Sequence, residues 1–144
     1  MKKVILVSFI ISLIACQKDN AQEVSPELAK IAGKWQLYKI GYGFPPPNGP
    51  TQTTSTNQEI IEFDVNKVTF ARTISGKISE SGSFELKQLP DGGTTLRDAI
   101  VFKNTNTYSF IAFDESTFSL IMHQAAPMGA VLADGNSFFY QKIE

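Results

Sequence analysis

The sequence predicts an all-β fold in which eight antiparallel strands follow one another and close into an up-and-down barrel. Apolar and polar residues alternate with a period of two along most of the chain, as expected for strands with one buried face. Short segments rich in Gly, Asn, Asp and Ser separate these stretches, and short connections force neighbouring strands to run antiparallel. Eleven Phe and four Tyr residues suit strands, and closure into a barrel leaves no exposed edge.

The alternation places the strands one by one. In the second strand, for example, Ile61, Phe63 and Val65 share one face, whereas Glu62 and Asp64 point to the other. The same period recurs along the rest of the chain. The eight expected strands are residues 34–44, 59–65, 67–74, 78–89, 94–103, 107–113, 117–124 and 137–144.

Three segments lie outside these strands. A short helical lead precedes the first strand, since Ser25 can cap it, Pro26 fits its first position and Gly33 can end it. A long polar connection, rich in Pro, Gly and Thr, occupies 45–58. A second connection is unusually apolar over 125–132, and we expect it to tuck against the rim of the barrel.

The N-terminal residues predict export. Two lysines precede an uncharged run over 4–15, which is shorter than the roughly 20 residues that a membrane-spanning helix needs. A basic start and a short apolar core are typical of a secretory signal peptide, here residues 1–15. The run ends at Leu13-Ile14-Ala15-Cys16, which resembles the lipobox of bacterial lipoproteins. The resemblance implies that Cys16 carries acyl chains and becomes the first residue of the mature protein.

The expected organisation is therefore a signal peptide at 1–15, a lipidated tether with a short helical lead at 16–30, and a barrel domain at 31–144. Two or three acyl chains suffice for stable attachment, so we expect a membrane anchor in the cell envelope. The run Gln17-Lys18-Asp19 resembles the signal that sends lipoproteins to the cell surface in Bacteroidetes-type bacteria. Surface display on the outer membrane and a plain solvated tether are the two alternatives.

The composition argues against nucleic-acid binding and against an internal disulfide. The net charge is −1 and no basic cluster occurs, so a nucleic acid is not an expected partner. Cys16 is the single cysteine, so no internal disulfide can form and the domain depends on its own core.

Gly33-Lys34-Trp35 opens the first strand with a Gly-x-Trp motif, which resembles the lipocalin signature. The lipobox, an "IEFDVNK" second strand and a closing "FYQKI" also resemble the lipocalin-like lipoproteins of Bacteroidetes-type bacteria. The resemblance implies that Trp35, with Gly33, plugs the closed end of the barrel. Lipocalins place an Arg from the last strand on this Trp, and here the nearest candidate is Lys142, a poorer stacking partner.

The candidate ligand-lining residues follow from strand parity. Arg72 shares its parity with apolar neighbours, so its guanidinium should point inward, where it needs a partner or a bound anion. A strand-end Arg that reaches solvent is the alternative. The large rings either fill the barrel or line a pocket for one small ligand. The full candidate set is Phe63, Phe70, Arg72, Phe84, Tyr108, Phe110, Phe118, Leu120, Met122, Phe138 and Tyr140.

Nothing in the sequence pairs a nucleophile with a base. His123 is the single histidine and no second His or Cys accompanies it, so we expect no metal and no cofactor. The acidic residues Glu59, Glu62 and Asp64 on one strand are expected to be solvated. We therefore expect non-catalytic binding of a small apolar or amphipathic ligand by a membrane-anchored barrel. The alternative is a solid barrel that acts through its surface loops on an envelope protein.

Overall fold

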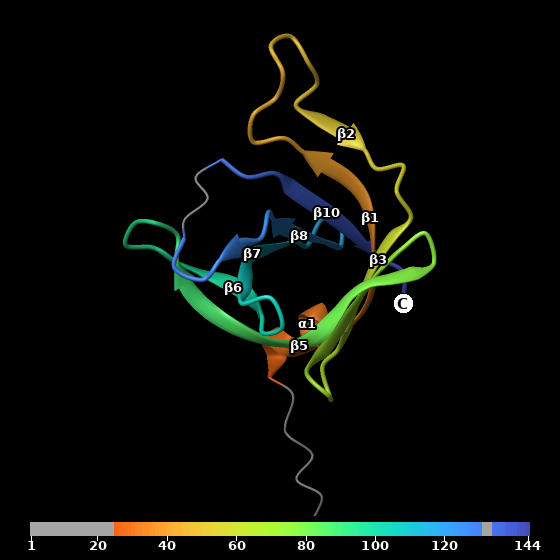
Figure 1. The fold of residues 1–144 in the computed structure, drawn as a ribbon, viewed down its shortest axis with the longest axis vertical. Coiled ribbons are helices and arrows are strands. Elements are labelled where there is room, and N and C mark those ends of the chain that lie inside the picture. The colour runs from red at the N-terminus through yellow and green to blue at the C-terminus, as the bar shows by residue number, and fades with distance from the viewer. Residues whose placement is uncertain (1–24, 131–133) are drawn as a thin grey trace, which may run out of the picture.

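The computed structural model describes residues 25–130 and 134–144, and it is a closed antiparallel barrel (Figure 1). Eight strands form the wall in the order β1, β3, β4, β5, β6, β7, β8 and β10, and β10 pairs back with β1. The predicted fold class is confirmed. The strands are β1 (Gly33–Gly41), β3 (Glu59–Asp64), β4 (Thr69–Ile74), β5 (Lys77–Pro90), β6 (Leu96–Phe102), β7 (Thr107–Asp114), β8 (Ser119–His123) and β10 (Ser137–Lys142).

Three further elements flank the wall. The helix α1 (Pro26–Ile31) is capped by Ser25, whose Oγ accepts a hydrogen bond from the Leu28 backbone N–H at 3.3 Å. Each long connection contains one short strand. In the first, β2 (Gln52–Thr54) pairs with β1, and in the second, β9 (Ala126–Pro127) pairs with β7.

The interior is a packed core formed by alternate residues of the wall strands. The Phe63 and Phe84 rings meet edge to face with centroids 5.2 Å apart, and those of Phe70 and Phe102 do so at 4.7 Å. Burying each such side chain contributes about 1.5–3 kcal/mol. The buried members of this core are Ile31, Trp35, Leu37, Ile61, Phe63, Phe70, Phe84, Ile100, Phe102, Ile111, Leu120, Met122 and Tyr140.

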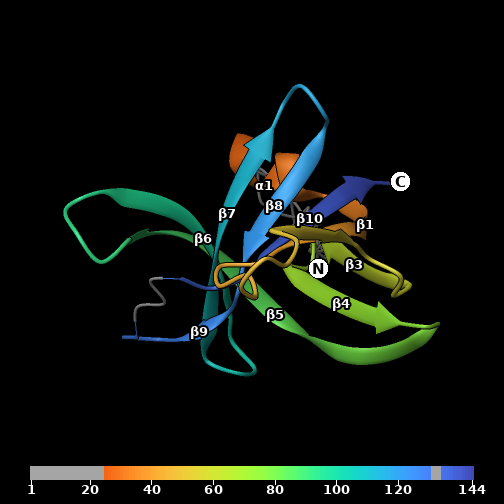
Figure 2. The ribbon, with the colours of Figure 1, turned by 90° about the horizontal axis from the view of Figure 1, so that it is seen from above.

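The chain direction gives the barrel two unlike ends. Strand direction places the helix α1 and the β3–β4 and β7–β8 turns at one end, which we call the helix end, and Figure 2 shows the β7–β8 turn on the same side as α1. Strand direction places both long connections and the β6–β7 turn at the other end, which we call the loop end. No helix in the described part of the chain is long and apolar enough to cross a membrane.

Two of the candidate lining residues lie on the outer face of β7. Tyr108 and Phe110 were expected inside, but their odd-numbered neighbours Ser109 and Ile111 face the interior instead. Both faces of β7 carry bulky residues, so alternation alone does not choose between them. Tyr108 and Phe110 pack outside in a second cluster with Ala99, Val101, Ala126 and Leu89.

Phe118 also departs from its expected place, because it belongs to a turn rather than to a strand. It is 80% exposed and adopts a left-handed φ of 48°. It ends the β7–β8 connection, just as Val68 and Asn106 end the β3–β4 and β6–β7 connections with φ values of 53° and 52°. One residue in this conformation breaks the parity that alternation assumes, so the predicted strand began too early.

Candidate functional site

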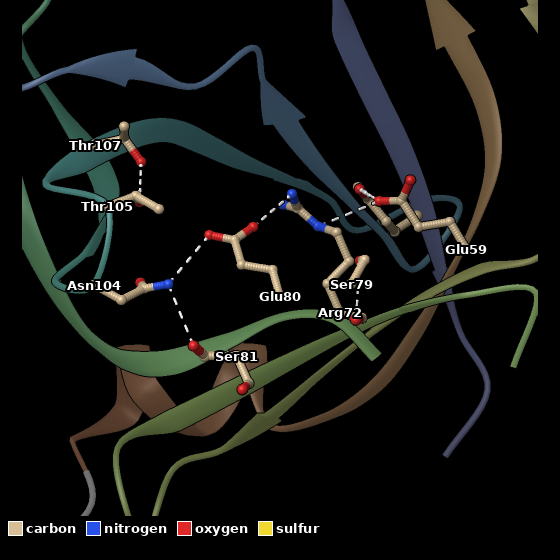
Figure 3. Close-up of polar contacts among 9 residues, drawn as sticks. Glu59, Arg72, Ser79, Glu80, Ser81, Asn104, Thr105 and Thr107 are labelled. Carbon is tan, nitrogen blue, oxygen red and sulfur yellow. Dashed lines mark hydrogen bonds and ion pairs between the residues drawn. The ribbon is translucent and has the colours of Figure 1, made fainter. Parts of the chain in front are cut away.

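The most polar part of the barrel interior is an ion cluster at the loop end. The Arg72 guanidinium lies between two carboxylates, as Figure 3 shows. Its Nη1 donates a hydrogen bond to Glu80 Oε2 at 3.0 Å, and its Nε lies 3.5 Å from Glu59 Oε1. The three side chains are only partly exposed, at 26% for Arg72, 15% for Glu59 and 25% for Glu80. Arg72 therefore points inward as predicted, and its partners are the protein's own acids.

Strand pairing explains why these three residues meet. Arg72 on β4 pairs with Glu80 on β5 and with Ile61 on β3. Glu59 has the same parity as the interior residues Ile61 and Phe63, so its side chain points inward too. The expectation that Glu59 is solvated was wrong. Its parity with Ile61 and Phe63 could have indicated its inward orientation from the sequence.

Tyr140 and Asn104 extend the cluster. The Tyr140 hydroxyl donates a 2.6 Å hydrogen bond to Glu59 Oε1. Burial, and secondarily the nearby Glu59 charge, raise the pKa of Tyr140 far above its usual range, so it remains a donor. Asn104 Nδ2 donates to Glu80 Oε1 at 3.5 Å (Figure 3). Both carboxylates are thus held by neutral donors as well as by Arg72.

A pocket of about 260 Å³ opens beside this cluster. Its lining combines the charged and polar side chains of Glu59, Arg72 and Tyr140 with apolar side chains such as Phe102 and Met122. The Arg72 guanidinium lies 6.0 Å from the Phe102 ring centroid, so charged and apolar groups are neighbours in this lining. Arg72 Nε faces inward and is buried without a hydrogen-bond acceptor among the described residues. Glu59 Oε1 lies 3.5 Å from this Nε and compensates its charge. Its lining residues are Glu59, Arg72, Phe102, Ser109, Met122, His123, Gln124, Ala125, Phe138 and Tyr140.

His123 lies on the rim of this pocket and is half-buried. Arg97 Nη2 donates to its Nε2 at 3.0 Å, and its Nδ1 lies 3.2 Å from Ser137 Oγ. Since Arg97 is a donor only, Nε2 must be the unprotonated nitrogen of a neutral ring. Burial, and then the Arg97 charge, hold the pKa of His123 below its usual value.

The candidate lining residues thus divide into groups. Arg72, Met122, Phe138 and Tyr140 meet at the pocket. Phe63, Phe70, Phe84 and Leu120 are buried in the packed core and do not line it. Tyr108, Phe110 and Phe118 lie outside the barrel interior. Parity reasoning missed Glu80, which pairs with Arg72. It also missed six residues that line the pocket, namely Glu59, Phe102, Ser109, His123, Gln124 and Ala125.

The Gly-x-Trp motif lies at the helix end. Trp35 is buried, and its Nε1–H donates a hydrogen bond to the Ile31 carbonyl oxygen at 2.8 Å. This bond joins the end of α1 to the first wall strand. Gly33 has a left-handed φ of 101°, and a Cβ there would collide with the Glu144 carbonyl oxygen, so only glycine fits. Lys142 Nζ lies 5.4 Å from the Trp35 ring centroid, which is the contact expected of it.

Within the described ranges, no group of three His, Cys, Asp or Glu side chains is arranged to hold a metal ion. Cys16 lies outside the described residues. Comparison of the chain with protein-family models, with curated proteins and with solved structures finds no significant match.

Proposed function

We propose that this protein is a lipid-anchored, lipocalin-like barrel that binds one small amphipathic molecule at its loop end, without catalysis. The observation that carries the proposal is the pocket of about 260 Å³, whose lining combines an ion cluster with apolar side chains. Its volume is close to the lower end of small-molecule sites, which run from about 300 Å³ upward. It would take a guest of modest size.

The charges in the pocket constrain the polar group of the guest. Arg72 is already compensated by Glu59 and Glu80, so the three side chains together carry one negative charge. A guest carboxylate would add a third acid to a partly desolvated site, which is unfavourable. We therefore expect the guest to present a hydroxyl, an amide or an amine to Glu59 and Arg72, with its apolar part against Phe102 and Met122.

Calorimetry with three eight-carbon probes tests the binding proposal. Octylamine and octanol should bind the full chain more tightly than octanoate does. Phe138→Trp should fill the pocket and abolish the heat of binding, because Phe138 lines it. The neighbouring residue Phe139 does not line the pocket, so Phe139→Trp is the matched control and should bind like the parent. Equal binding by both variants, or no binding of any probe, would contradict the proposal.

The anchor is tested separately at Cys16. Replacement by Ser should prevent incorporation of a palmitate analogue in cells, because the thiol is the acceptor of the first lipid. Label that persists in the Cys16→Ser variant would overturn the lipobox interpretation and leave the pocket proposal untouched.

A solid barrel with an accessory role in an envelope complex is the second candidate. The packed interior supports it, because Phe63, Phe70 and Phe84 occupy the space that a larger ligand would need. Failure of all three probes to bind would favour this candidate over small-molecule binding.

A further inference from the structure

The helix end carries an apolar groove that the proposed ligand site does not use. The groove measures about 490 Å³ and is lined by Trp35, Phe113 and Phe118, with Lys30 and Lys142 beside them. The Trp35 and Phe113 rings lie with centroids 6.3 Å apart and form its floor. Phe118 lines it from the last position of the β7–β8 turn, and Figure 2 shows that this turn lies at the same end as α1.

Phe118 is unusual among the residues that end turns in this barrel. Val68 holds the same position in the β3–β4 turn, but it is half-buried and packs against the core. Asn106 holds it in the β6–β7 turn and is a residue type that tolerates the left-handed conformation. Phe118 is bulky, left-handed and 80% exposed, so the part of the chain that the structure describes gives no packing reason for it. An external apolar partner would supply that reason.

The proposed lipid anchor supplies a candidate for that partner, because only a short link separates it from the helix end. Nine residue steps separate Cys16 from Ser25, and each spans at most about 3.6 Å, so the link reaches about 30 Å at full extension. Ser25 caps α1, and α1 is tied to Trp35 at the helix end. If Cys16 carries acyl chains, the groove is therefore held within one bilayer thickness of the membrane.

We infer that the helix end docks on the lipid bilayer, with Phe118 inserted among the lipids at the edge of the groove. The inference rests on the proposed lipid anchor and adds the orientation of the barrel. Lys30 and Lys142 suit the headgroup region, where long basic side chains extend to the polar layer. Asp114 and Glu115 also line the groove and balance these two charges. Docking is therefore driven by apolar insertion, and it should occur equally on phosphatidylcholine and on anionic vesicles.

Docking by the helix end has a consequence for the ligand site. The 260 Å³ pocket lies at the loop end, so it would face away from the membrane and take its guest from water.

Tryptophan quenching by brominated lipids tests the orientation. Phe118 and Phe44 make a matched pair, because they are 80% and 77% exposed and lie at the helix end and beyond the loop end of β1. The lipidated full chain and its Phe118→Trp and Phe44→Trp variants are reconstituted into vesicles of brominated phosphatidylcholine. The new Trp in Phe118→Trp should lose emission beyond the loss that Trp35 alone shows in the parent. Phe44→Trp should show no added loss.

Flotation of the same vesicles separates the two proposals. A protein that floats with the vesicles, but whose Phe118→Trp variant is quenched no more than the parent, is anchored without docking, and the inference fails. Added quenching in Phe44→Trp alone would show that the loop end docks instead. A protein that does not float overturns the lipid anchor, and the docking inference falls with it.

Discussion

The two ends of the barrel are closed in different ways. At the helix end, α1 lies against Trp35, and the contacts are apolar apart from one hydrogen bond from the indole N–H to the Ile31 carbonyl. At the loop end, the interior strand positions carry Arg72 and Glu59, and a pocket remains open beside them. The helix end is closed by apolar packing. The loop end holds partly buried charges, and each of these charges is stabilised only while its oppositely charged partner is present.

The two ends differ in how much they contribute to the stability of the fold. Apolar packing gains from every buried atom, so a sealed end contributes to folding without further conditions. A buried ion cluster roughly breaks even against apolar residues of the same shape, so it is weak evidence for stability. The charges at the loop end therefore add little net stability, and the proposed binding role would give them a use.

The largest effect is expected at the sealed end. Trp35→Ala removes the side chain that α1 packs on and should destabilise the protein by about 3–5 kcal/mol. A urea titration followed by circular dichroism measures this, since the substitution removes the single tryptophan. A loss below about 1 kcal/mol would mean that Trp35 is not the plug of the barrel.

A smaller effect is expected at the open end. Arg72→Met leaves Glu59 and Glu80 without their cation and should cost about 2–3 kcal/mol, less than a fully buried pair because these side chains are partly exposed. Adding Glu59→Gln and Glu80→Gln to the same chain should recover most of the loss. If the triple variant is as unstable as Arg72→Met, shape rather than charge decides the cost.

Gly33 tests how tightly the sealed end is built. Gly33→Ala combines a left-handed backbone with a collision against the Glu144 carbonyl and should cost about 2 kcal/mol. Gly76 is the control, because it is also left-handed but has open space around it, so Gly76→Ala should cost about 1 kcal/mol. Equal losses of stability in the two variants, measured by thermal or urea unfolding, would show that the C-terminal residues move aside to accommodate the new Cβ.

The smallest effect concerns pH at the open end. The pKa of His123 is lowered in the folded state below the ordinary value of 6.5, so the unfolded chain binds the proton more readily. Stability should therefore fall as pH drops below about 6.5, and His123→Gln should remove that part of the decline. Urea titrations of both proteins between pH 7.5 and pH 5 compare the slopes. Parallel slopes would contradict a neutral, partly buried His123.

Much of the wall could be predicted from local pattern. The strand Glu59–Asp64 and the helix cap at Ser25 follow from spacing that a short window contains. The face that β7 turns inward does not, because both of its faces are bulky and the connection through β9 covers the outer one. Phe118 was misplaced for a related reason, since one left-handed residue shifts the parity and no glycine marks it.

The sequence by itself determined that apolar and polar residues alternate along the strands, that successive strands run antiparallel, and that the strands close into a barrel. These features follow from side-chain periodicity and turn chemistry, which act between neighbouring residues. Strand parity also placed Arg72 on an inward-facing position, whereas the inward place of Trp35 came from the resemblance of its Gly-x-Trp motif. Only the tertiary structure decided that Arg72 meets Glu59 and Glu80 rather than a free anion, and that a pocket remains beside them. These outcomes depend on strand register and on what covers each face, and such contacts join residues that are far apart in the chain.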